Sequence, residues 1–213
     1  MSFSRCRVAI DYLYTINLSV IDRVTSNNDL GVLFTADLNF HLHIYSICCR
    51  ALKSLFFIMH TMKDFKLSRS LNTVYCSLVR SLLEYASVLW DPLVVIDSCH
   101  LERVQRRFFS SAPYMLKIVH PPHDYTPVLH ALNLTSLADR RVKPNLGFLG
   151  KLIDGSINAP SLLAQVNFKV PHHATRSRVP FTVPSNCTNC GRNKPIDRMM
   201  GLGNEDPTFL SSP

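Results

Sequence analysis

The stretch from Leu71 to Pro92, LNTVYCSLVRSLLEYASVLWDP, decides the fold of this chain. One set of apolar residues recurs in it at steps of three and four, the period of a helix face: Val74, Leu78, Leu82, Ala86 and Leu89. A second set widens this apolar surface beyond a single stripe: Tyr75, Val79, Leu83 and Trp90. Between Leu71 and Trp90 the charged residues are Arg80 and Glu84, which lie one turn apart, and Pro92 ends the helix. The stretch therefore predicts a central helix that is buried on most of its sides.

Two amphipathic helices are expected on either side of this central one. Residues 44–62 have a regular apolar face: Ile44, Ile47, Cys48, Ala51, Leu55, Ile58, Met59 and Met62. Its polar residues are expected on the opposite side: His43, Arg50, Lys53 and His60. Residues 98–110 predict a third helix, capped by Asp97 or Ser98, with Leu101, Val104 and Phe108 pointing inward. Its other side gathers three basic residues, Arg103, Arg106 and Arg107.

The amino-terminal residues predict a small β element. From Val8 to Val20 every second residue is apolar, and the length of this run places a turn near Asn17 to Ser19 that folds it into a hairpin. Residues 25–29 are expected to form a polar turn, and Leu30 to Phe34 a third short strand. The predicted fold class is therefore mainly α, with a helical bundle at residues 41–112 and a small antiparallel β element at residues 1–40.

The carboxyl-terminal half is less regular. Residues 125–132 predict a short helix, a second helix capped by Thr135 or Ser136 runs toward Leu152, and one more short helix follows between 157 and 168. Pro144 is expected to kink the second of these. Residues 113–168 are expected to form one helical region. Residues 169–213, rich in Pro, Ser, Asn and Thr, are expected to be a poorly ordered tail.

Composition narrows the class of protein. The chain has 213 residues, 46% of them apolar, which is enough for a packed core, and its seven cysteines are typical of reduced intracellular thiols. No secretory signal is evident, and Arg50 and Lys53 interrupt the apolar run at 42–62, so we expect a protein of the nucleus or cytoplasm that does not enter a membrane. The net charge of +8 favours a polyanionic partner.

Several short motifs occur in a fixed order around the central stretch. They are Leu78-Val79-Arg80, Leu83-Glu84-Tyr85, Trp90-Asp91-Pro92 and the run from Glu102 to Phe108, ERVQRRF. In order and spacing they resemble the segment just after the polymerase palm in reverse transcriptases of non-LTR retrotransposons, the jockey-like group in particular. The resemblance implies that residues 1–40 are a remnant of the palm edge, that 41–112 are a thumb-like bundle, and that 113–168 are a post-thumb region. It also implies nucleic acid as partner, in the form of a template–primer duplex.

The catalytic residues of that family have no counterpart here. RNA-directed DNA polymerases hold two Mg²⁺ ions on an aromatic-x-Asp-Asp turn and an earlier aspartate, whereas Asp11, Asp22, Asp29 and Asp37 are single and scattered. We therefore expect no catalytic residue, no metal site and no cofactor. The expected protein is a non-catalytic carboxyl-terminal fragment without fingers and without most of the palm. No small-molecule substrate is expected either.

The candidate functional residues are basic. Arg103, Arg106 and Arg107 suit contact with phosphates, although Glu102 could pair with Arg106 and a basic helix face is often merely solvated. A second, weaker cluster consists of Arg140, Arg141 and Lys143. Cys187 and Cys190 have the spacing of zinc ligands, with His172 and His173 upstream, but a single such pair predicts incidental thiols. Two alternatives remain open: a free-standing helical protein-interaction module, and a product that barely folds and has no function.

Overall fold

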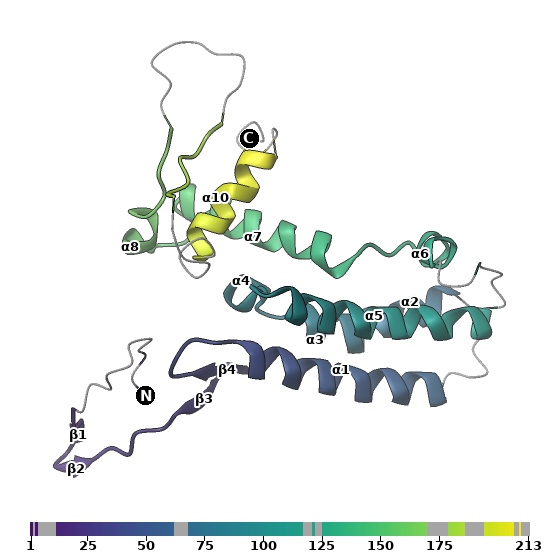
Figure 1. Cartoon of the computed structure of the whole chain (residues 1–213), viewed down its shortest axis with the longest axis horizontal. Helices are drawn as coiled ribbons and strands as arrows, with labels where there is room; N and C mark the ends of the chain where they lie inside the picture. Colours follow the sequence, from purple (N-terminus) through teal and green to yellow (C-terminus); the bar gives the residue numbers. More distant parts are fainter. Residues whose placement is uncertain are drawn as a thin grey trace. The chain divides into compact units, whose positions relative to one another are not determined.

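The protein is mainly helical, with two small antiparallel strand pairs, which confirms the predicted fold class (Figure 1). The computed structural model describes residues 1, 3, 12–61, 68–116, 121, 125–169, 179–185, 194–206 and 209. The chain forms two compact units. Unit 1 consists of Met1–Ala86 and Val94–Val119, and unit 2 of Ser87–Leu93 and His120–Pro213. The segment Ser87–Leu93 thus leaves unit 1 and returns to it, a crossing that the predicted domain ranges did not include.

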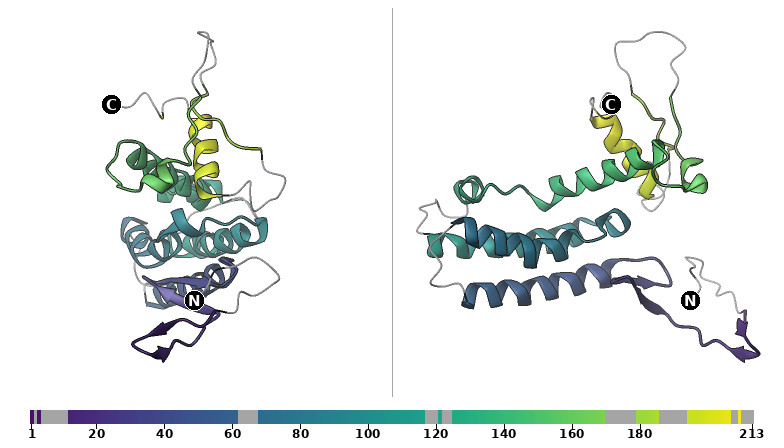
Figure 2. Two further views of the ribbon diagram at one scale, coloured as in Figure 1. Left: turned by 90° about the vertical axis from the view of Figure 1, so that its left-hand side faces the viewer. Right: turned by 180° about the vertical axis from the view of Figure 1, so that it is seen from behind.

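Unit 1 is built around α1 (His41–Thr61) and α5 (Val95–Leu116), which lie side by side (Figure 2). Most residues of the two predicted inward faces are buried, which confirms these faces. On α1 the buried apolar residues are Ile44, Ile47, Cys48, Ala51, Leu55 and Ile58, and on α5 they include Leu101, Val104 and Phe108. The first turns of the two helices are in contact, since Nδ1 of His41 lies 2.5 Å from Oδ1 of Asp97. Since α5 begins at Val95, Asp97 lies in the first turn of this helix and is not its cap.

The central stretch is not a single helix, which corrects the prediction. It comprises α2 (Ser68–Tyr75), the π-helical turn η1 (Cys76–Arg80), α3 (Ser81–Glu84) and α4 (Ser87–Trp90). In η1 the amide of Ser81 donates to the carbonyl of Cys76, five residues back, as a π-helix requires. The helix breaks at Ala86, whose φ of 53° lies in the left-handed region.

The buried face of this stretch is the second apolar set and not the first. Leu71, Tyr75, Val79 and Leu83 are fully buried, whereas Leu78 and Leu89 of the first set are 47% and 51% exposed. The ring of Tyr75 stacks on that of Phe108, with centroids 4.0 Å apart and planes 6° from parallel. The core-facing residues, Leu71, Tyr75, Val79 and Leu83, follow at steps of four through α2, η1 and α3. The residues of the first set lie beside them and are half-buried or exposed.

Two hairpins precede α1. The first pairs β1 (Thr15–Ile16) with β2 (Ser19–Val20), which confirms the predicted turn, while residues 8–11 of the predicted strand lie outside the described residues. The second pairs β3 (Ser26–Asp29) with β4 (Val32–Thr35), so the expected polar turn at 25–29 is instead largely a strand. Its tight turn is Leu30-Gly31, both with positive φ, as a two-residue hairpin favours.

One residue of α1 that was expected to face solvent ties this hairpin to the helix. His43 is buried, and its Nδ1 accepts a hydrogen bond from the amide of Leu33 in β4 at 3.2 Å. Burial, with a smaller contribution from Arg50, lowers the pKa of His43, so the neutral ring that this bond requires is favoured. Tyr85 fixes the hairpin from the other side, because its hydroxyl donates to the carbonyl of Leu30 at 2.8 Å.

By length and hydropathy alone, α1 could also cross a membrane. Core helices of soluble proteins pass the same test, and α1 contributes the buried face described above to unit 1.

Unit 2 contains α6 (Thr126–Leu132), α7 (Leu137–Ile153), α8 (Pro160–Leu163) and α10 (Pro195–Glu205). The first three confirm the predicted helices, and Ser136 caps α7 by accepting a hydrogen bond from the amide of Asp139 at 3.0 Å. Pro144 lies inside α7, which continues past it to Ile153.

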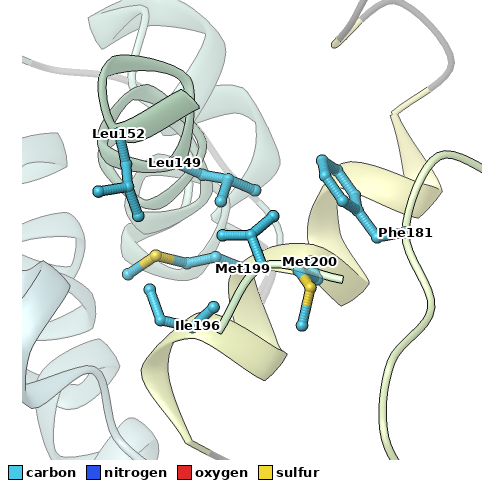
Figure 3. Packing of buried hydrophobic residues seen from close by; sticks show 7 residues of the cluster. Leu149, Leu152, Phe181, Ile196, Met199 and Met200 are labelled. Atoms are coloured by element: carbon cyan, nitrogen blue, oxygen red, sulfur yellow. The ribbon is translucent and has the colours of Figure 1, made fainter. Parts of the chain in front are cut away.

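The core of unit 2 joins α7 to α10 and to Val166 and Phe181, and Figure 3 shows its side chains converging. It consists of Leu149, Leu152, Val166, Phe181, Ile196, Met199 and Met200. The prediction of a poorly ordered tail from residue 169 is therefore wrong for 195–205, which form α10 and fill this core. A Cβ at Gly203 would lie 2.9 Å from Cε2 of Phe181, so a larger residue at this position would displace that buried ring.

Candidate nucleic-acid interface

The three arginines of α5 lie on its exposed side, as predicted. Arg103, Arg106 and Arg107 are exposed, while Leu101 and Val104 on the opposite side of the helix are buried. Steps of three and four residues bring the three guanidinium groups onto one face of the helix. This set, Arg103, Arg106 and Arg107, is called the arginine face below.

The arginine face is largely unneutralised. Within the described part of the chain, neither Arg103 nor Arg106 lies within ion-pair distance of a carboxylate, so the alternative pair between Glu102 and Arg106 does not form. Arg107 is positioned by an aromatic ring, because its guanidinium carbon lies 5.7 Å from the ring centroid of Phe56 on α1. Free guanidinium groups with five donors each suit phosphate oxygens.

A surface pocket of about 440 Å³ adjoins the arginine face between α1 and α5. It is lined by Met59, Arg107, Ser110, Ser111 and Tyr114. The hydroxyls of both serines donate to the carbonyl oxygen of Arg107, at 2.9 Å and 3.0 Å. The pocket therefore combines one cation, two hydroxyl groups and a phenol ring on the side of α5 that already holds the arginines.

The second predicted cluster does not form a common surface. Lys143 is exposed and Arg140 is half-buried, but Arg141 is only 4% exposed and its Nε donates to Oδ1 of Asp91 at 2.9 Å. Arg141 is therefore a buried structural residue, and its assignment as a phosphate contact is wrong. The physical reason is its neighbour: a carboxylate 50 positions earlier in the chain neutralises it within unit 2.

Asp91 is the centre of a buried polar network that the sequence did not reveal. Its second oxygen accepts from Nδ2 of Asn145 at 3.0 Å and lies 3.5 Å from Nε of Arg198. Burial lowers the pKa of Arg198, the Asp91 carboxylate raises it, and the neighbouring guanidinium of Arg141 lowers it. Two guanidinium groups from α7 and α10 thus share one carboxylate from the segment Ser87–Leu93. The sequence drew attention to Asp91, which lies in the motif Trp90-Asp91-Pro92, but it did not indicate the partners of this carboxylate.

No catalytic arrangement is evident in the described part of the chain. Among these residues there is no group of three or more His, Cys, Asp or Glu side chains that could hold a metal ion. Cys187, Cys190, His172 and His173, the weak zinc candidates, lie outside the described residues. Of the described cysteines, Cys48 is buried and Cys99 is exposed, and both are free thiols.

Comparison with models of protein families, with curated proteins and with solved structures finds no match to this chain. The resemblance to non-LTR reverse transcriptases therefore stays a prediction from the quoted motifs.

Proposed function

We propose that this chain binds the phosphate backbone of nucleic acid through Arg103, Arg106 and Arg107, without reading base sequence. The observation that carries the proposal is the arginine face itself: three exposed guanidinium groups on one side of a core helix of unit 1. Contacts to phosphate fix register and orientation but carry no sequence information, and no base-reading element is invoked. The net charge of +8 adds a long-range attraction to any polyanion.

The resemblance of the quoted motifs extends this proposal to a family of proteins. We propose further that the chain corresponds to the thumb and post-thumb part of a non-LTR retrotransposon reverse transcriptase, with a template–primer duplex as its ancestral partner. Without the paired aspartates of the polymerase site, the chain alone is expected to bind nucleic acid and not to extend a primer. Primer-dependent incorporation of nucleotides by the purified chain would contradict this.

Salt dependence is the direct test of backbone binding. Each neutralised phosphate of duplex DNA contributes about 0.9 to the slope of log K against log salt concentration. Replacing the three arginines by glutamine is therefore expected to lower the slope by about two to three units, measured by fluorescence anisotropy with a labelled duplex. An unchanged slope would refute the assignment.

A matched control removes the same amount of charge elsewhere. Lys151, Lys169 and Lys194 are exposed and belong to unit 2, outside the proposed site. The triple glutamine variant at these positions carries the same net charge as the arginine variant, so any general effect of charge appears in both. The slope is expected to fall in the arginine variant only.

A protein-interaction module is the second candidate. Exposed apolar side chains on α1 favour it, namely Leu42, Tyr45 and Phe57, at 54%, 58% and 64% exposure. Binding that is driven by such a surface is expected to vary little with salt, so the same titration separates the two candidates.

A further inference from the structure

The arginine face continues along α5 to an exposed aromatic ring. From Arg103 the steps to Arg107, Ser111 and Tyr114 are four, four and three residues, so these side chains follow one side of the helix. Tyr114 is 88% exposed, which is unusual for a large side chain with an apolar ring. In the described residues no ring contact or hydrogen bond involves it. The packing of unit 1 therefore gives no reason for a tyrosine at this position.

The pocket beside this ring has the size and chemistry of a site for a small planar group with an attached anion. Its volume of about 440 Å³ is in the range of small-ligand sites. Tyr114 offers a π face, Met59 a polarisable thioether, and Arg107 a cation whose position is restrained by Phe56. The hydroxyl oxygens of Ser110 and Ser111 retain acceptor lone pairs after donating to the backbone.

We propose that this pocket receives one unpaired base of a single-stranded nucleic acid, stacked on Tyr114, while the adjoining phosphates contact the arginine face. In a duplex both faces of each base are covered by its neighbours, so only a single strand, or an unpaired end, can present a base to the ring. Every base has a π face, so the pocket distinguishes unpaired from paired nucleotides without selecting a sequence. This inference rests on the proposed function, because the arginine face supplies the phosphate contacts.

The test compares two probes and two variants of the full chain. The probes are a fluorescein-labelled oligo-dT of about 16 nucleotides, long enough to cover the site sizes of single-strand binding domains, and a labelled blunt-ended duplex without a loop or overhang. At about 50 mM salt, Tyr114→Ala is expected to raise the Kd for oligo-dT at least about fivefold and to leave the Kd for the duplex unchanged. Tyr114→Phe keeps the ring and is expected to retain wild-type affinity for both probes.

The outcomes separate this inference from the proposed function. If Tyr114→Ala changes the Kd for both probes equally, or for neither, while the arginine variant loses salt-dependent binding, the stacking site is refuted and backbone binding stands. If the wild-type chain binds neither probe with steep salt dependence, backbone binding itself is refuted, and the stacking site with it. Because Tyr114 is exposed, loss of folding is not expected in either variant, and circular dichroism checks this.

Discussion

Replacing Asp91 by alanine is expected to destabilise unit 2 by about 3–5 kcal/mol, the range measured when one partner of a buried ion pair is removed. The structure gives the reason. The side chains of Arg141 and Arg198 are only 5% and 15% exposed, and both point at the Asp91 carboxylate, at 2.9 Å and 3.5 Å. Without that carboxylate, two like charges stay buried next to each other. Asn145, which is fully buried, loses an acceptor as well.

The single tryptophan of the chain makes this loss measurable. Trp90 precedes Asp91 directly, belongs to unit 2 and is 1% exposed, so its fluorescence is expected to change when unit 2 unfolds. Equilibrium unfolding in urea, followed at this tryptophan, gives the free energy of unfolding for wild type and variant. Since typical domains have only about 5–15 kcal/mol of stability, a change of this size moves the midpoint far toward water.

Two further variants separate charge from shape. Asp91→Asn keeps the size of the side chain and loses its charge, so it is expected to show most of the destabilisation. Asp154→Ala removes an exposed acid of the same unit and is expected to change stability by less than about 0.5 kcal/mol. A loss below about 1 kcal/mol for Asp91→Ala, with an unchanged dependence on urea, would show that the network is not a buried ion cluster in solution.

Three other predictions concern unit 1. Phe108→Ala removes a ring that is 1% exposed and is expected to cost about 3–5 kcal/mol, seen as a lower midpoint of thermal unfolding by circular dichroism. Burial, and secondly Arg50, lowers the pKa of His43 below its ordinary 6.5, so the unfolded chain takes up the proton more readily. Stability of unit 1 should therefore be full above pH 6.5 and fall as the pH drops below it, and His43→Gln should reduce that slope in urea titrations. Burial raises the pKa of the Cys48 thiol to about 12, so iodoacetamide at neutral pH should label exposed Cys99 well before Cys48, as peptide mass mapping can verify.

Periodicity predicted the helices whose apolar face is unambiguous. In α1 and α5 the apolar residues at helical spacing form one continuous face, so Leu55 and Leu101 were assigned to the core correctly. The central stretch is apolar on two sides, and periodicity could not tell which one packs. Tyr75 is buried and Leu78 is exposed, and the stretch is interrupted by a π-helical turn and by a break at Ala86, which the spacing of apolar residues did not predict.

The candidate site was predictable where exposure follows from helix geometry. The arginine face is opposite the buried side of α5 and was found for that reason. Arg141 was misassigned because its partner lies 50 residues away, and its helix offers no local sign of burial. The helix α10 was missed because the residues before it are polar and rich in proline, although Ile196, Met199 and Met200 recur at helical spacing within it.

Unit 2 is built from two separate stretches of the sequence, Ser87–Leu93 and His120–Pro213, so no single continuous fragment contains unit 2 alone. A fragment of residues 120–213 contains Arg141 and Arg198 but lacks the carboxylate that neutralises them. A recombination breakpoint between 94 and 119 would separate the same groups. Splitting or exchange of the two units at such a point is therefore expected to destabilise unit 2, and a peptide containing residues 87–93 is expected to restore part of the lost stability.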